Sequence, residues 1–245
     1  MAPTKMFHKP FYLLDAKAQS RHIAPMSLEP CQIYLITPPQ IADLDAFCKN
    51  LRAALSAAPV ACLQIRLKEV NGDKPQDSAV VQACNAIKPI CHEYGTLVII
   101  NDNPDLTKQC EADGVHLGQN DMDYFSSREL LGGDVIIGVT CHNSKGLGFE
   151  AANAGADYVA FGAFFETPTK AAKYRAETEI LEWWQEAVEI PSVAIGGITV
   201  ENAAQIIEAG ADFIAVSSGV WSHPDGPASA VSQLSQLCQA HSQQD

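Results

Sequence analysis

The chain lacks any cysteine pair spaced like a zinc ligand set or a redox centre. It has eight cysteines but no CxxC motif, and several of them lie inside apolar segments, where free cysteine packs as a small hydrophobic residue. The N-terminal segment has no continuous apolar core of the signal-peptide kind, and no stretch approaches the length of a membrane span. These absences predict a reduced, soluble, cytoplasmic protein.

A basic run is also missing. Positive charge is scarce, with 16 Lys and Arg against 29 Asp and Glu, a net charge of −13. Proteins that bind duplex nucleic acid or an anionic membrane carry a basic face, so neither is an expected partner. An anionic small molecule is still compatible with this charge, provided that cations or a metal gather locally.

The first apolar run ends in "ITPPQ", without the glycines of a dinucleotide-binding fingerprint. That absence counts against an open doubly wound sheet, the main alternative for an α/β chain. Eight nearly continuous apolar runs alternate with amphipathic stretches, the pattern of strands buried on both faces of a parallel sheet. We therefore predict an α/β fold, a single (β/α)8 TIM barrel over residues 31–245, with residues 1–30 as an N-terminal extension. The runs are 31–37, 61–67, 96–100, 114–118, 135–140, 158–165, 192–198 and 213–220.

In such a barrel, functional side chains follow the strands at their carboxyl ends. After the second run, Gln64, Arg66 and Lys68 alternate with apolar residues, so a period of two places all three on one face. Two cations near the barrel mouth predict an anion site. The alternative is a strand that ends early and leaves Arg66 and Lys68 in solvent.

Acidic residues follow the third and fourth runs. Asp102 and Asp121 occupy matched positions at neighbouring strand ends, and two carboxylates there suit Mg²⁺. Taken singly, Asp102 would serve the turn at "NDNP" and Asp121 would cap a helix that begins near Ser126. The pair together favours a metal site.

The sixth run leads into a loop with hydroxyls and cations, among them Thr167, Thr169 and Lys170. Such a loop suits a phosphate or a diphosphate, although many charged loops are only solvated.

The seventh and eighth runs end in "GGIT" and "VSSG". In TIM barrels these two loops commonly bind phosphate through backbone N–H groups, which predicts roles for Gly197, Ser217 and Ser218.

The fifth run ends in Thr140, Cys141 and His142, all of them candidates for polar contact. Neighbouring strand residues point to opposite faces, so Cys141 and His142 do not form a nucleophile–base pair. No residue stands out as a nucleophile.

The segments "QIRLK", "IND", "ADGVHLGQND", "GADYVAFGAFFETPTK", "AIGGIT" and "AGADFIAVSSG" resemble the thiamine phosphate synthase family, over about residues 31–235. The resemblance implies a transferase that condenses 4-amino-5-hydroxymethyl-2-methylpyrimidine diphosphate with thiazole phosphate, releasing pyrophosphate by a Mg²⁺-assisted, carbocation-like dissociative mechanism. It implies that Gln64, Arg66, Lys68, Asn101 and Lys170 hold the pyrimidine diphosphate, Asp102 and Asp121 the Mg²⁺, and Thr167, Thr169, Gly197, Ser217 and Ser218 the thiazole phosphate. Catalytic roles fall to Arg66, Lys68, Lys170 and Thr140.

Two positions differ from related patterns. Thr140 stands where the family usually has Ser, beside the expected place of the pyrimidine. Ala163 stands where the related thiazole tautomerase has His. A tautomerase-like isomerase and a non-catalytic paralogue that binds a phosphate ligand are the alternatives, and the sequence leaves open whether the chain forms a homo-oligomer.

Overall fold

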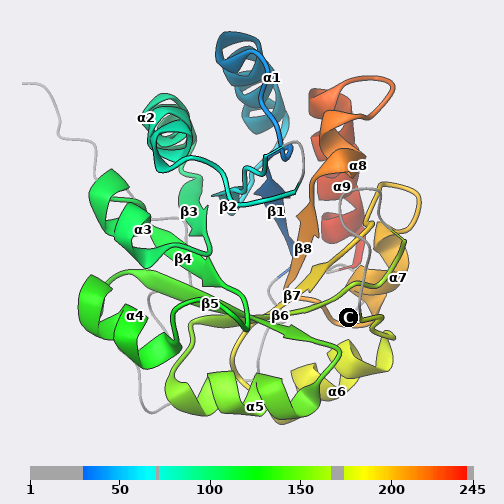
Figure 1. Ribbon diagram of the computed structural model, residues 1–245. Helices are drawn as coiled ribbons and strands as arrows, with labels where there is room; N and C mark the ends of the chain where they lie inside the picture. The colour runs from blue at the N-terminus through cyan, green and yellow to red at the C-terminus, as the bar shows by residue number, and fades with distance from the viewer. Residues whose placement is uncertain (1–29, 70–71, 167–173, 242–245) are drawn as a thin grey trace, which may run out of the picture.

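The eight strands form a closed barrel in the computed structural model, which describes residues 30–69, 72–166 and 174–241. All neighbouring strands are parallel, and β1 pairs with β8 to complete the ring. The predicted (β/α)8 TIM barrel is confirmed, and the open sheet is excluded (Figure 1). The strands are β1 (Gln32–Ile36), β2 (Cys62–Ile65), β3 (Leu97–Asn101), β4 (Gly114–Leu117), β5 (Ile136–His142), β6 (Tyr158–Gly162), β7 (Ser192–Ile195) and β8 (Phe213–Val216).

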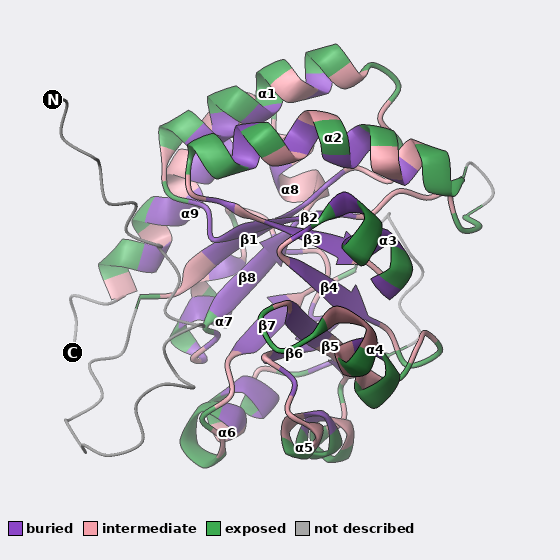
Figure 2. Cartoon of the chain, turned by 90° about the vertical axis from the view of Figure 1, so that its left-hand side faces the viewer, coloured by how far each residue is buried: buried purple, intermediate pink, exposed green. Residues whose placement is uncertain are grey.

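Helices surround the strands, and their exposed residues face away from the barrel (Figure 2). They are α1 (Leu44–Ala57), α2 (Asp77–Glu93), α3 (Pro104–Cys110), α4 (Tyr124–Leu131), α5 (Lys145–Ala154), α6 (Glu179–Ala187), α7 (Ala203–Glu208), α8 (Ser218–Trp221) and α9 (Pro227–His241). None of these helices, taken over the described ranges, is long and apolar enough to cross a bilayer. The predicted extension, residues 1–30, falls almost entirely outside those ranges and stays a prediction.

The strands separate two cores because their side chains alternate between faces. Ile33 and Leu35 of β1 point outward and join the large cluster under the helices. Tyr34 and Ile36 point inward and join a second cluster inside the barrel. This alternation also sends Gln64 of β2 into the interior, where it is buried.

Candidate active site

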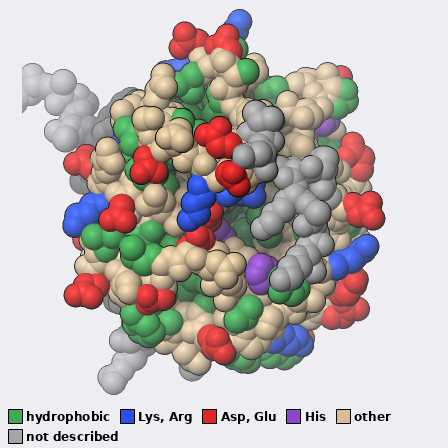
Figure 3. All heavy atoms as spheres, in the orientation of Figure 1, with side chains coloured by type: hydrophobic (Ala, Val, Ile, Leu, Met, Phe, Trp, Pro, Cys, Tyr) green, Lys and Arg blue, Asp and Glu red, His purple; other side chains and the backbone are tan. Residues whose placement is uncertain are grey.

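Charged side chains gather around a hollow at the carboxyl ends of the strands. Figure 3, drawn in the orientation of Figure 1, shows basic and acidic groups side by side next to that hollow. Gln64 and Asn101 lie at the ends of β2 and β3, and Gln64 Nε2 donates a hydrogen bond to Asn101 Oδ1 over 2.7 Å. The rim of the barrel, formed by the carboxyl ends of the strands, therefore carries charged side chains together with amide groups held in a fixed orientation.

The loop after β2 carries the two predicted cations. β2 ends at Ile65 because the next backbone N–H, that of Arg66, donates to Thr37 Oγ1 instead of to a neighbouring strand. The Lys68 N–H donates to Pro39 O, which ties the loop to the end of β1. Lys68 Nζ lies 3.5 Å from Asp102 Oδ2. Burial lowers the pKa of Arg66, while the nearby Asp102 carboxylate opposes that shift.

The two predicted metal ligands lie together. Asp102 is held by its backbone N–H, which donates to His116 O over 2.8 Å, in a left-handed conformation with φ of 64°. Asp121 Oδ2 accepts from Gly118 N, and its Oδ1 lies 3.5 Å from Lys74 Nζ. Burial, and then the contact with Asp102, raises the pKa of Asp121. Two carboxyl groups in contact repel unless a proton or a cation lies between them.

Neither aspartate caps a helix. Asn103 Oδ1 accepts from Leu106 N at the start of α3, and Asp123 Oδ1 accepts from Phe125 N at the start of α4. The alternative in which Asp121 caps a helix near Ser126 is therefore wrong, since the neighbouring Asp123 fills that role.

The loops after β7 and β8 meet each other. A Cβ added at Gly219 would lie 2.5 Å from Ile198 O, so these backbones approach closely. Gly197 has a φ of 68°, and its carbonyl accepts from Asn202 Nδ2, which fixes the loop after β7. Ser217 donates its hydroxyl to Thr37 O, which joins the loop after β8 to the end of β1.

A bulge lies in β5 between Thr140 and His142, where the pairing with β6 shifts by one residue. Thr140 Oγ1 faces the interior and lies 2.8 Å from His116 Nε2. Cys141 points the other way, into the core under the helices, and burial raises its pKa to about 12. The thiol is thus a packing group.

Three predicted residues, Thr167, Thr169 and Lys170, lie outside the described residues. The remaining predicted residues lie at the carboxyl ends of strands or in the loops that follow, except Ser218, which begins α8. Over the described ranges, no group of three or more His, Cys, Asp or Glu side chains is arranged to hold a metal ion.

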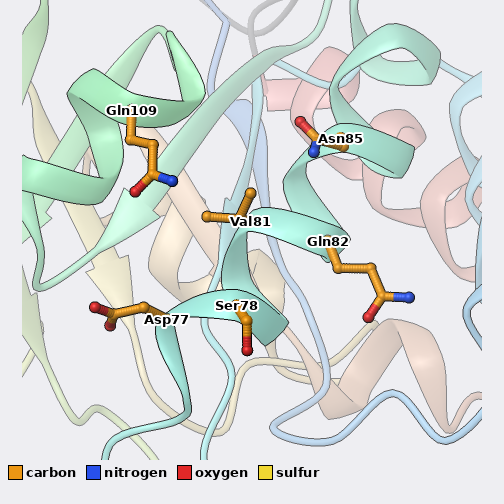
Figure 4. A pocket seen from close by; sticks show the side chains of 6 residues that line it. All are labelled: Asp77, Ser78, Val81, Gln82, Asn85 and Gln109. Atoms are coloured by element: carbon orange, nitrogen blue, oxygen red, sulfur yellow. The ribbon is translucent and has the colours of Figure 1, made fainter.

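A groove of about 510 Å³ lies away from the mouth, between α2 and α3 (Figure 4). It is lined by Asp77, Ser78, Val81, Gln82, Asn85 and Gln109. Its lining includes a carboxylate and no cation, so an anionic substrate finds no charge partner there.

Sequence reasoning missed Tyr34, His116 and Tyr158. All three are buried in the barrel and hydrogen-bonded to residues at its rim or to each other. Each occurs in an apolar run, where a single polar atom gives no signal. Only the interruption of "GVHLG" by a histidine could have drawn notice.

A family model described as thiamine monophosphate synthase matches residues 33–220. A thiamine-phosphate synthase of Rhodospirillum centenum is 52% identical over 207 residues, covering 84% of this chain and 97% of the relative. One of Hyphomonas neptunium is 52% identical over 206 residues, covering 84% and 93%. Among solved structures, the thiamine phosphate pyrophosphorylase of Pyrococcus furiosus superposes with a TM-score of 0.73 at 29% identity, covering 87% of this chain and 96% of that one.

Proposed function

Because the chain belongs to the thiamine monophosphate synthase family, we propose that it is a transferase that makes thiamine phosphate. Its substrates are then 4-amino-5-hydroxymethyl-2-methylpyrimidine diphosphate and thiazole phosphate, and its second product is pyrophosphate. The observation that carries this assignment, beside the family, is the cluster of Arg66 and Lys68 around the paired Asp102 and Asp121.

The donor set of the two aspartates fits Mg²⁺. This ion prefers carboxylate oxygens, keeps several waters, and is commonly bound through one or two carboxylates together with substrate phosphates. The contact between Asp102 and Asp121 raises the pKa of Asp121, and a divalent cation would relieve that repulsion. When bound, Mg²⁺ supplies positive charge to the diphosphate oxygens.

The mechanism needs no protein nucleophile. The bond between the pyrimidine methylene carbon and the diphosphate oxygen breaks, and its electron pair leaves with the diphosphate. Arg66 and Lys68 stabilise this growing negative charge, with Lys170 as a third cation on sequence grounds. The electron-rich pyrimidine stabilises the positive carbon, and the lone pair of the thiazole nitrogen then forms the new C–N bond.

The uncharged groups orient the two substrates. Gln64 and Asn101 lie at the ends of the neighbouring strands β2 and β3, and Thr140 lies on β5, around the place proposed for the pyrimidine. We assign the thiazole phosphate to a second set of residues: Thr167, Thr169, Gly197, Ser217 and Ser218. A monophosphate suits backbone N–H groups and hydroxyls, since it needs less countercharge than a diphosphate.

The test is a two-substrate assay with the purified chain, in which thiamine phosphate and pyrophosphate are both measured with Mg²⁺ and with chelator. Mg²⁺-dependent formation of the two products in equal amounts is expected. Isomerisation of a thiazole substrate that survives chelation would favour the tautomerase alternative. Binding of thiamine phosphate without turnover would favour the non-catalytic one.

A further inference from the structure

A chain of hydrogen bonds crosses the barrel interior beneath the mouth. At one end Gln64 Nε2 donates to Asn101 Oδ1 over 2.7 Å, and Tyr34 donates its hydroxyl to Gln64 Oε1 over 3.3 Å. The hydroxyl oxygens of Tyr34 and Tyr158 lie 3.0 Å apart. This half of the chain links β3, β2, β1 and β6.

The other half runs through a histidine. Tyr158 Oη lies 2.9 Å from His116 Nδ1, and His116 Nε2 lies 2.8 Å from Thr140 Oγ1. The two rings lie nearly parallel, with an interplanar angle of 20°. Asn101 and Thr140, the two ends, are partly exposed, whereas every residue between them is buried.

The direction of this chain follows from counting protons. Tyr34 has one hydroxyl proton, which it donates to Gln64 Oε1. In the contact between the two tyrosines, the donor must therefore be Tyr158. The single hydroxyl proton of Tyr158 is then used in the bond to Tyr34, so Tyr158 Oη must accept from His116 Nδ1–H. A neutral imidazole protonated at Nδ1 has a bare Nε2, which accepts the hydroxyl proton of Thr140.

The imidazole is neutral at physiological pH. The ring is buried, and its two nitrogens lie against the hydroxyl oxygens of Tyr158 and Thr140, so neither contact offsets the cost of burying a positive charge. A charged ring would donate from both nitrogens and would break the order described above. Among the described residues, no buried side-chain nitrogen or oxygen atom lacks a hydrogen-bond partner, as this order requires.

We propose that Tyr34, His116 and Tyr158 are positioning residues that fix the hydrogen-bonding sense of Thr140 and Asn101 at the mouth. Thr140, whose proton is turned inward, faces the substrate as an acceptor. Asn101, whose carbonyl is occupied by Gln64, faces it as an amide donor. The inference rests on the proposed function for its substrate, a ring that carries an exocyclic amino group.

This arrangement, with a hydrogen-bond acceptor at Thr140 and a donor at Asn101, determines which substrates fit. An amino N–H of the pyrimidine meets an acceptor at Thr140, while a ring nitrogen or diphosphate oxygen meets a donor at Asn101. A ring with a carbonyl in place of the amino group would put two acceptors together at Thr140. Buried polar groups left unpaired in this way give strong discrimination between otherwise similar substrates.

The first test reads the tautomer directly and does not depend on activity. The full chain is labelled with ¹⁵N in its seven histidines, and a His116→Gln variant identifies the signal of this ring by NMR. At pH 7 we expect a neutral ring with the proton on Nδ1. A proton on Nε2, or a charged ring, would overturn the proposed direction.

The second test is a double-mutant cycle. Tyr158→Phe removes one hydroxyl far from the substrate, and we expect kcat/KM for the pyrimidine diphosphate to fall about tenfold, with KM for thiazole phosphate within about twofold of wild type. In a Thr140→Val background the same change should have an effect below about twofold, because no hydroxyl remains to orient. In a Thr140→Ser background, which keeps the hydroxyl, the tenfold effect should return.

A loss of equal size in the Val and Ser backgrounds would show that Tyr158 acts on general packing and would overturn the proposal. Tyr124→Phe is the matched control, because Tyr124 donates its hydroxyl to Gly155 O in the helical layer and should leave the kinetics unchanged. A wild-type chain without turnover would instead refute the proposed function, and the tautomer experiment would still decide the direction of the chain.

Discussion

At the scale of single residues, charge and hydrogen bonding occupy different layers of the barrel. Four partly exposed residues carry the charges at the rim: Arg66, Lys68, Asp102 and Asp121. Directly beneath lies the uncharged chain that includes His116, whose pKa is held low by burial. Removing a rim group should therefore affect turnover, and removing a group beneath should also affect folding.

Asp102→Asn should lower kcat/KM by about 100-fold, because a neutral amide would hold the proposed Mg²⁺ less tightly and so weaken the stabilisation of the leaving diphosphate. Lys170→Ala should also depress turnover. Both variants should keep the wild-type melting temperature, in Asp102→Asn because this partly exposed side chain at the rim contributes little to the core. The control is Asp105→Asn, at an exposed position in the first turn of α3, which should leave the steady-state kinetics unchanged.

His116 should make stability depend on pH. Its pKa is about 4 in the folded chain and near 6.5 when unfolded, so the unfolded state binds the extra proton first as pH falls. The contribution of His116 to the free energy of unfolding is therefore fully present above pH 6.5. It declines by about 3 kcal/mol between pH 6.5 and pH 4. Urea unfolding at pH 7 and pH 5 should register about 2 kcal/mol of this decline.

In His116→Gln the part of the decline that belongs to this ring should vanish, even though the variant starts from a lower stability. His223→Gln, a change near the surface, should keep the wild-type slope. An unchanged slope in His116→Gln would show that another group causes the loss.

The sequence predicted the rim better than the layer beneath it. Gln64, Asp102 and Asp121 interrupt apolar runs at the point where a barrel strand ends, so their placement at the mouth followed from the pattern alone. Tyr34 and Tyr158 are ordinary residues of apolar strands in the sequence. Their hydroxyls meet only because the barrel closes, which brings together residues 124 positions apart.

At the scale of elements, most strands are shorter than the apolar runs that predicted them, although β3 equals its run in length and β5 exceeds its run. The run 61–67 continues two residues beyond β2, which ends when the Arg66 N–H turns to the Thr37 side chain. Hydrophobicity marks what is buried, whereas a strand ends where its ladder of backbone hydrogen bonds ends. The bulge in β5 escaped prediction for the same reason.

The pairing of β5 with β6 depends on one small residue. Gly138 lies opposite Tyr158, and a Cβ added to it would lie 1.9 Å from Cζ of that ring. Gly138→Ala should therefore displace the ring and cost about 1–3 kcal/mol of unfolding free energy.

Urea unfolding measures this cost, and the loss should be accompanied by a fall in kcat/KM for the pyrimidine diphosphate like that of Tyr158→Phe. Gly133→Ala, where an added Cβ meets no atom within 4 Å, is the control and should be neutral. A fully stable and active Gly138→Ala chain would contradict the close packing of this pair.

At the scale of the whole molecule, α9 completes the layer around the barrel. It packs against α1 and β1, at the place where β1 pairs with β8. Leu234 is fully buried on this helix, and Leu234→Ala should cost about 2–5 kcal/mol of unfolding free energy.

Thermal and urea unfolding measure that cost, and any turnover that remains should show the wild-type KM values. Gln236→Ala, on the exposed face of the same helix, should change neither stability nor kinetics. A Leu234→Ala chain as stable as Gln236→Ala would show that burial of Leu234 does not hold α9 in place, since neither change to Ala lowers helix propensity.

The closure of β1 on β8 makes the order of the eight units cyclic. Cys31 lies just before β1 and interacts with Cys238 near the end of α9, so the beginning of the first strand lies beside the end of the last helix. Both lie at the amino ends of the strands, on the side of the barrel opposite the mouth. A short peptide joining residues 30 and 241 would yield a ring, which could be reopened at the exposed loop around Gly132 and Gly133 to give a circular permutant with the same rim. By the same geometry, a carrier or a surface attached at that junction would leave substrate access free.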